Sequence, residues 1–97
     1  MIEIFWEFEV REGQAPEFER QYCSTGAWAE FFRRSPAYRG TTLYAGAGNR
    51  YITWDRWDSQ EAYEEFRLAH REEYDALDQR FAALTVSERS LGLFEMK

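Results

Sequence analysis

His70 is the side chain best suited to chemistry near neutral pH, because it is the single histidine of the sequence and a neutral imidazole accepts a proton there. It falls on the apolar side of a helical pattern. Tyr74 follows one turn later, where its hydroxyl could donate a hydrogen bond to a substrate oxygen. The two are candidate catalytic residues. The competing interpretation is structural, since a histidine within an aromatic stripe is more often a packed core residue.

Metal, thiol and phosphate-binding chemistry have little support. One histidine and one cysteine, far apart, do not supply the ligands of a zinc or non-haem iron site, so no metal is expected. Cys23 has no histidine near it in the sequence and is expected to be an inert thiol. The glycine-containing stretch 46–49 precedes a strand pattern, where a phosphate-binding loop would precede a helix. It is interpreted as a turn.

Composition restricts the remaining classes of protein. A chain of 97 residues supports one core, so residues 1–97 are expected to form a single domain. Its 8 Phe, 6 Tyr and 4 Trp supply large side chains for that core. A formal charge of −6 disfavours nucleic acid as a partner. The lack of a long apolar run disfavours a membrane span. The acidic start predicts no secretory signal, and the single cysteine agrees with a cytoplasmic location.

The first third of the sequence predicts a strand followed by two short helices. Apolar and polar residues alternate over 2–10, which is typical of a half-buried strand. Pro16 is placed to open a helix. The apolar phase slips at 24–26, where Gly26 suits a left-handed helix end. A second short helix follows and ends before Pro36.

The rest of the sequence predicts a hairpin, a long helix and a last strand. Residues 38–45 and 50–57 flank the glycine-containing turn. Asp58 and Glu61 form a capping-box pattern at the start of a helix whose apolar positions recur every three or four residues to 84. The strand over 85–94 is expected to be irregular around Gly92. Which face of strand 50–57 meets the helices is left open: the alternatives are Tyr51, Thr53, Asp55 and Trp57, or Ile52, Trp54 and Arg56.

The resulting order, βαββαβ, predicts an α+β fold of the ferredoxin-like kind, a four-stranded antiparallel sheet with both helical segments on one face. The second sheet face would then expose aromatic side chains such as Phe5. A second copy of the chain is the simplest cover for that face. A homodimer through the open sheet face is therefore expected.

Two segments resemble a known family. Residues 8–13 leading to 17–19, and residues 51–63 with Trp57-Asp58-Ser59 before the helix, are similar to the dimeric α/β-barrel proteins with antibiotic biosynthesis monooxygenase-like domains. The resemblance covers nearly the whole chain and implies the ferredoxin-like fold and a dimeric α/β barrel. The family includes cofactor-free oxygenases of aromatic polyketides, quinol oxygenases, heme-degrading enzymes and members with no known reaction, so the fold does not decide the function.

The sequence departs from the heme-degrading branch of this family. Trp57 matches that branch's tryptophan, but Trp6 stands where the branch has an asparagine, and His70 lies about one turn beyond the expected histidine. No heme or other cofactor is expected.

The resemblance implies a cofactor-independent monooxygenase acting on a small aromatic, polyketide or quinone-like substrate. His70 and Tyr74 would be catalytic. The substrate-binding residues would be Trp6, Asp55, Trp57, Tyr63 and Phe66. An inward-facing Asp55 would need a partner, for which His70 and Arg89 are candidates, whereas an outward-facing one would form a surface ion pair. The alternative function is a non-catalytic small-molecule-binding or interaction domain, in which the same aromatic side chains are core and dimer contacts.

Overall fold

The alternating N-terminal segment forms a central strand of the sheet, and a computed structural model describes the chain over residues 1–97. The elements are β1 (Ile2–Val10), α1 (Ala15–Tyr22), α2 (Ala27–Phe32), β2 (Tyr38–Ala45), β3 (Arg50–Trp57), α3 (Gln60–Ala69), α4 (Arg71–Phe81), the 3-10 turn η1 (Ala82–Leu84) and β4 (Thr85–Glu95). The four strands form one sheet in the order β2-β3-β1-β4, and every neighbouring pair is antiparallel. The predicted α+β, ferredoxin-like fold is confirmed.

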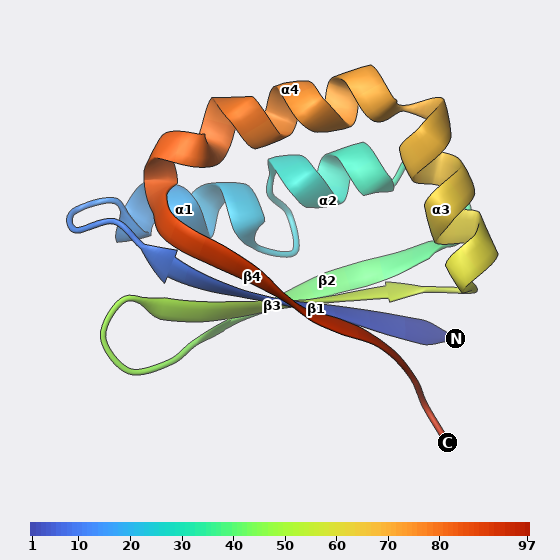
Figure 1. Ribbon diagram of the computed structural model, residues 1–97, viewed down its shortest axis with the longest axis horizontal. Coiled ribbons are helices and arrows are strands. Elements are labelled where there is room, and N and C mark those ends of the chain that lie inside the picture. Colours follow the sequence, from blue (N-terminus) through green and yellow to red (C-terminus); the bar gives the residue numbers. More distant parts are fainter.

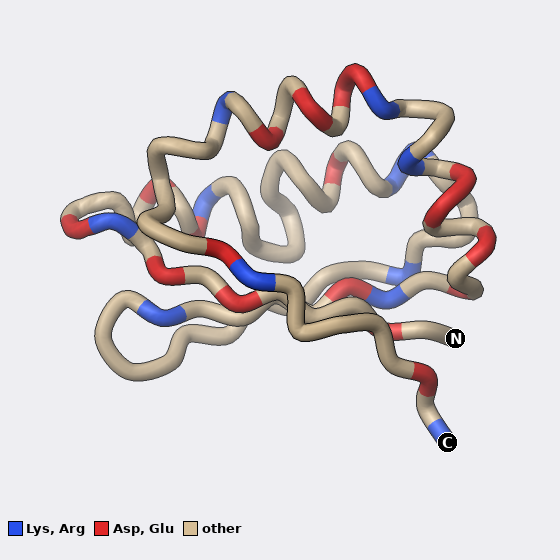
Figure 2. Tube along the Cα trace, viewed as in Figure 1, with Lys and Arg blue, Asp and Glu red and all other residues tan.

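All the helices lie on one face of this sheet, as Figure 1 shows, and the opposite face carries no element of the chain. Acidic and basic residues are spread along the helices and the strands (Figure 2). No helix has the length and apolar character that a bilayer crossing requires. Two regions can bind other molecules: the space between the helices and the sheet, and the open sheet face.

The orientation of β3 decides which side chains face the helices. Tyr51, Thr53, Asp55 and Trp57 are all buried on the inner face, whereas Ile52, Trp54 and Arg56 are partly exposed on the outer one. The first of the two alternatives is therefore the observed one, and β3 needs no bulge to achieve it.

Two clusters of buried side chains fill the space between sheet and helices. The Trp57 cluster consists of Ile2, Ile4, Ala29, Phe31, Phe32, Tyr38, Trp57, Tyr63 and Phe66. The Phe18 cluster consists of Phe8, Val10, Phe18, Tyr22, Tyr51, Phe81 and Leu84. The clusters pack at opposite ends of the inner sheet face, since Trp57 and Tyr51 lie at opposite ends of β3.

The long helix predicted from 58 to 84 is in fact two helices. His70 has φ −119° and ψ 32°, outside the helical range, and it ends α3 and starts α4. The backbone hydrogen bonds from His70 N to Phe66 O and from Tyr74 N to His70 O continue on either side. The chain therefore turns at His70 without losing its hydrogen bonds, and the apolar spacing alone did not reveal the turn.

The start of α3 also differs from the prediction. Ser59, not Asp58, is the N-cap, and its hydroxyl accepts a hydrogen bond from the Ala62 amide at 3.1 Å. Asp58 instead accepts two hydrogen bonds from the Arg39 guanidinium, at 2.6 and 2.9 Å. Serine is as good an N-cap as aspartate, so local sequence does not choose between the two neighbours.

Gly26 breaks the first helical segment for a reason other than the predicted one. Its φ is −81°, an ordinary value, so it does not adopt the left-handed conformation. A Cβ atom at this position would lie 2.4 Å from the Gln21 carbonyl oxygen. Glycine is needed there for the close approach of two backbone segments. The irregularity predicted in the last strand is present, because the β1–β4 register shifts beside Gly92, whose φ is +109°.

Candidate functional site

A pocket forms on the inner sheet face because side-chain size falls in the middle of that face. At one end Tyr51 pairs with Phe8, and at the other Trp57 pairs with Ile2. Between these rows β2 and β3 present smaller, polar residues: Thr53, which lies opposite Trp6 of β1, and Asp55, which lies opposite Thr41 of β2. The sheet therefore places Thr41, Thr53 and Asp55 beneath the helices as a polar floor.

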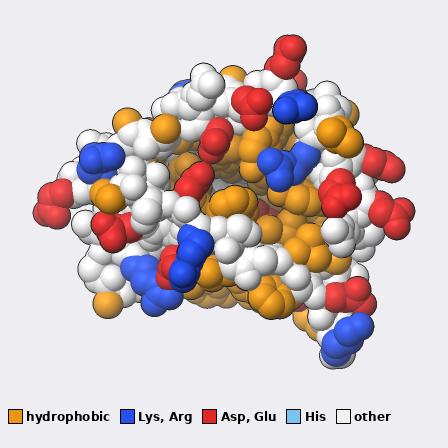
Figure 3. All heavy atoms as spheres, viewed as in Figure 1, with side chains coloured by type: hydrophobic (Ala, Val, Ile, Leu, Met, Phe, Trp, Pro, Cys, Tyr) orange, Lys and Arg blue, Asp and Glu red, His pale blue; other side chains and the backbone are white.

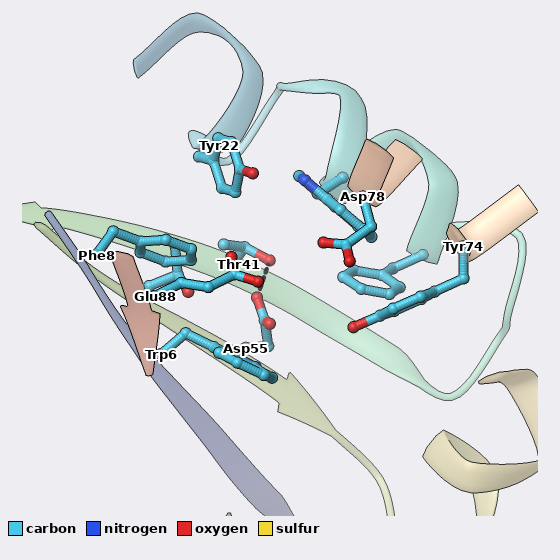
Figure 4. Close-up of a pocket in the computed structure, with 11 residues that line it drawn as sticks. Trp6, Phe8, Tyr22, Thr41, Asp55, Tyr74, Asp78 and Glu88 are labelled. Carbon is cyan, nitrogen blue, oxygen red and sulfur yellow. Dashed lines mark hydrogen bonds between the residues drawn. The ribbon is translucent and has the colours of Figure 1, made fainter. Parts of the chain in front are cut away.

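Aromatic side chains from both layers enclose this floor. The pocket is lined by Trp6, Phe8, Tyr22, Trp28, Phe32, Thr41, Thr53, Asp55, Tyr74, Asp78 and Glu88. It gives about 50 Å³ of room for water-sized molecules, and about 460 Å³ of empty space when the part open to solvent is included. Figure 3 shows the molecular surface hollowed between the layers, and Figure 4 shows the side chains that converge on the hollow.

Asp55 is the most unusual polar group of the floor. Its side chain is 8% exposed, and Thr41 donates a hydrogen bond to its Oδ1 at 2.6 Å. The Tyr38 hydroxyl is in turn bonded to the Thr41 hydroxyl. Oδ2 of Asp55 has no hydrogen-bond partner within the chain. Burial raises the pKa of Asp55 to about 6, against the opposing effects of the Thr41 hydrogen bond and the Arg56 charge. A carboxylate with this pKa is suited to accept a proton near neutral pH.

Tyr74 comes from α4 and points its hydroxyl toward the same space (Figure 4). Burial raises its pKa above the ordinary tyrosine value, and burial also raises the pKa of Tyr22 on the opposite wall to about 12. Both phenols therefore stay protonated at neutral pH. They are hydrogen-bond donors facing a pocket whose floor holds a carboxylate.

Two further carboxylates lie at the side of the pocket, Asp78 from α4 and Glu88 from β4. Partial burial raises the pKa of Glu88, and the nearby charge of Asp78 raises it further. The two groups are therefore close enough for their charges to interact. Across the whole chain, no group of three or more His, Cys, Asp or Glu is arranged to hold a metal ion.

His70 does not line this pocket. Its ring packs against Phe66, with 4.4 Å between the ring centroids, and its Nδ1 lies 3.7 Å from a carboxylate oxygen of Glu73. The His70 side chain is 32% exposed, and it sits at the corner between α3 and α4. The observed partner of the inward-facing Asp55 is Thr41, so the predicted pairing with His70 or Arg89 is wrong. Arg89, the other candidate, binds Glu7 at 2.7 Å.

Of the residues expected to bind substrate, Trp6 and Asp55 line the pocket, as does the candidate catalytic residue Tyr74. Trp57, Tyr63 and Phe66 belong to the Trp57 cluster and lie outside the pocket lining. The Trp57 ring is fully buried, with the ring centroids of Tyr63 and Phe66 at 5.4 and 5.5 Å. These three side chains form part of the core at the Trp57 end of the inner sheet face.

Comparison with solved structures gives matches over the whole length of the chain. A variant of SnoaB, a cofactor-independent oxygenase from Streptomyces nogalater, superposes with a TM-score of 0.78 at 25% identity, covering 99% of this chain and 92% of that one. A monooxygenase from the gene ActVA-Orf6 of Streptomyces coelicolor, in complex with nanaomycin D, gives 0.75 at 19% identity, with coverages of 99% and 87%. The chain has the fold of the antibiotic biosynthesis monooxygenases.

The same antibiotic biosynthesis monooxygenase fold extends to proteins with other names. An uncharacterized NIPSNAP domain protein from Burkholderia xenovorans gives a TM-score of 0.69 at 19% identity, covering 100% of this chain and 95% of that one. Neither a protein-family model nor a curated protein sequence matches the chain. The resemblance drawn from residues 8–13, 17–19 and 51–63 is confirmed by the matches to solved structures.

Sequence reasoning missed several residues that line the pocket of this monooxygenase fold. Thr41 and Thr53 carry a usable signal, because a small polar residue on an otherwise aromatic strand face leaves space at that position. Asp78 follows Tyr74 by four residues and so shares its side of the helix, and it is an exposed residue at the open side of the pocket. Glu88 has no comparable local signal, since its place depends on the pairing of β4 with β1.

Proposed function

We propose that this protein is a cofactor-independent monooxygenase that oxidises a small hydroxylated aromatic, polyketide or quinone-like molecule in the pocket beneath α2 and α4. The observation that carries the proposal is the buried carboxylate of Asp55, whose Oδ2 has no partner in the chain and which lies on the floor of an aromatic-walled pocket. The solved SnoaB and ActVA-Orf6 structures, described as an oxygenase and a monooxygenase, support the reaction class.

The proposed chemistry begins with a proton transfer. Asp55 accepts a proton from an acidic position of the substrate, such as the methylene group of an anthrone, and leaves a resonance-stabilised anion. That anion passes an electron to dioxygen, and the two radicals combine at the same carbon. The methylene group and dioxygen then give a carbonyl group and water, so atoms and electrons balance with no further reductant. The protein's task is to bind the ring, remove the proton and limit access of water.

The other pocket residues have roles that follow from their positions. Tyr74 donates a hydrogen bond to the oxygen on which negative charge develops, because its hydroxyl faces the pocket and stays protonated. Trp6 supplies a flat apolar wall beside Asp55. Trp57, Tyr63 and Phe66 hold the floor in place from the core. The geometry favours Asp55 over His70 as the proton acceptor, since His70 is outside the pocket lining.

Oxygen uptake by metal-free protein with a hydroxylated anthrone tests this function. The wild-type protein should consume oxygen catalytically, and Asp55→Asn should slow the reaction roughly 100-fold or more, the usual contribution of a general base. His70→Ala is the control and should keep near-wild-type activity. Equal activity of Asp55→Asn and wild type would remove Asp55 from the mechanism. Loss of activity in His70→Ala with a normal fold would return the role to His70.

A non-catalytic small-molecule-binding or interaction domain is the second candidate function, and the limited room of the pocket favours the interaction role. About 50 Å³ for water-sized molecules is less than an aromatic ring occupies, so a substrate must enter through the open side or displace wall residues. A protein that binds an anthrone without consuming oxygen would establish this alternative.

We also propose a homodimer formed through the open sheet face. On that face Phe5 stacks on Trp54 at 5.8 Å and meets Phe94 edge-on at 5.6 Å, and Tyr44 lies beside Trp54. Phe94 is 53% exposed and Tyr44 is 49% exposed, which leaves a large apolar surface for a second copy to cover.

Sedimentation velocity tests the dimer. The wild-type protein should sediment at twice the chain mass of 11.6 kDa, and Trp54→Glu should sediment at the single-chain mass. Leu68→Glu is the matched control, because Leu68 is 73% exposed on α3, away from the sheet. A wild-type monomer at micromolar concentration, or a Trp54→Glu dimer, would contradict the proposal.

A further inference from the structure

The charge that lines the pocket is one-sided. Asp55 lies on the floor, Asp78 projects from α4 and Glu88 projects from β4, whereas no lysine, arginine or histidine is among the lining residues. Asp78 and Glu88 are exposed residues at the open side of the pocket, and a cleft lined by one sign of charge raises the local concentration of ligands of the opposite sign. The proposed oxygenase chemistry needs one carboxylate only, so Asp78 and Glu88 call for another explanation.

Asp78 and Glu88 are also unpaired within the chain. Neither forms an ion pair or a side-chain hydrogen bond, although other carboxylates of the protein, such as Glu7 and Asp58, bind arginine. The arginine next to Glu88 in sequence, Arg89, is engaged by Glu7 at 2.7 Å. Partial burial raises the pKa of Glu88, and repulsion by the negative charge of Asp78 raises it further. A bound cation would relieve this repulsion.

Two further observations indicate that the carboxylates face a ligand. Oδ2 of Asp55, a side chain that is 8% exposed, has no partner and lies on the floor of the same pocket. Aromatic rings flank the acidic groups: Trp28 meets Tyr74 edge-on at 5.1 Å and Tyr22 at 6.3 Å. Carboxylates combined with aromatic faces form the environment in which proteins bind organic ammonium groups.

We propose that Asp78 and Glu88 select a ligand that carries a positively charged amino group beside its aromatic ring. This proposal rests on the proposed function, from which it takes the aromatic ligand. It adds that this ligand carries a positive charge. The ring lies between Trp6 and Tyr74 over Asp55, and the ammonium group lies between Asp78 and Glu88. Aromatic carboxylates of the same size are repelled. An ammonium group also offsets the negative charge that proton removal creates on the ligand.

Three test ligands of nearly equal shape separate charge from size: tyramine, tyrosol and 4-hydroxyphenylacetate, which carry an ammonium, a hydroxyl and a carboxylate group on the same phenol. Quenching of the fluorescence of Trp6 and Trp28, which line the pocket, reports binding. We expect the Kd to rise about tenfold from tyramine to tyrosol and about tenfold again to the carboxylate, and both steps to shrink in high salt.

The double variant Asp78→Asn with Glu88→Gln removes the two charges and keeps the side-chain shapes. In this variant the three ligands should bind within about threefold of one another, because the remaining charge lies only at Asp55. The matched control is Glu72→Gln with Asp75→Asn, an equal change of net charge at residues of α4 outside this pocket. The control should keep the wild-type order of affinities.

Equal affinity of the wild-type protein for the three ligands, no binding of any of them at millimolar concentration, or an unchanged order in the double variant would each overturn the selection. The outcome is independent of catalysis. If the protein consumes oxygen with an anthrone but binds the three phenols equally, the proposed function stands and the preference for an ammonium ligand is wrong. If the protein prefers tyramine but consumes no oxygen with an anthrone, the preference for an ammonium ligand stands and the proposed oxygenase function is wrong.

Discussion

Trp57 and Asp55 lie two residues apart on the same face of β3, yet their surroundings are opposite. Trp57 is completely buried among aromatic rings from α2, α3 and β2. Asp55 is buried beside two threonines and faces a hollow. The end of β3 therefore lies in a filled core, whereas its middle lies beside a partly empty polar pocket. The difference comes from side-chain volume and polarity, because the backbone is regular throughout.

The two regions of β3 contribute to different properties of the protein. Rings packed on all sides contribute dispersion and hydrophobic free energy, so the Trp57 cluster stabilises the fold. A buried carboxylate with one unpartnered oxygen lowers stability, because desolvation disfavours its charge.

The largest loss of stability is expected from a substitution in the Trp57 cluster. Trp57→Ala should lower the free energy of unfolding by about 3–5 kcal/mol, since it leaves a large cavity in the core. Trp6→Ala is the matched change in the pocket and should lower it by about 1–2 kcal/mol, because Trp6 is only partly buried and one side of its ring already faces a hollow. Urea unfolding measures both values. Equal losses of unfolding free energy in the two variants would show that Trp6 is packed as tightly as Trp57.

The next effect is a gain in stability from Asp55→Asn. The folded-state pKa of Asp55 is raised from 3.8 to about 6, so the folded protein holds this proton more tightly than the unfolded chain. The associated stability is fully present below pH 3.8 and is lost as the pH rises through about 6. At pH 7 the asparagine variant should therefore be more stable by about 1–3 kcal/mol.

The pH dependence of unfolding provides the check on Asp55→Asn. The gain should disappear near pH 4, where the wild-type carboxyl is protonated and resembles the amide. A variant that is less stable than wild type at pH 7 would show that Asp55 is a well-satisfied structural group.

Thr41→Val has a smaller effect and acts through Asp55. The Thr41 hydrogen bond lowers the pKa of Asp55, so its removal should move that pKa up by about one unit. The midpoint of the rise of oxygen uptake with pH should move with it. The loss of stability should be about 1 kcal/mol, the usual contribution of one hydrogen bond. An unchanged midpoint with unchanged activity would separate Thr41 from the proton acceptor.

His70→Ala should have the smallest effect. Its ring contacts Phe66, but a third of the side chain is exposed, and its contact with Glu73 is a surface one. The loss of stability should be below about 1 kcal/mol, with unchanged oxygen uptake. Thermal unfolding followed by circular dichroism measures the first. A loss of several kcal/mol would show that the turn between α3 and α4 depends on the histidine.

The strands were predictable because each has a pattern that local physics produces. Alternation at 2–10, and turn residues between 45 and 50, decide β1 and the β2–β3 hairpin without long-range information. The face of β3 was not predictable, since Thr53 and Asp55 are polar on the inner side and Trp54 is aromatic on the outer side. A polar pocket on the inner face and an aromatic outer surface both reverse the usual hydrophobic pattern.

The site was predictable only in part, for a related reason. Trp6, Asp55 and Tyr74 carry chemistry that a sequence displays. The hollow itself depends on rows of residues across four strands, and on a helix turn at His70 that keeps its backbone hydrogen bonds. The order of residues along one helix could not show that His70 turns away while Tyr74 faces the pocket.

Gly26 has a consequence for how the pocket can vary. Any side chain at this position would collide with the Gln21 carbonyl, so the path from α1 to α2 admits glycine alone. Two residues later α2 carries Trp28, a wall of the pocket. In a saturation-mutagenesis library, position 26 should therefore tolerate almost nothing, whereas positions 78 and 88, at the open side, should accept many residues. New ligand preferences would then arise from substitutions at positions 78 and 88, while Gly26 and the backbone path from α1 to α2 stay unchanged.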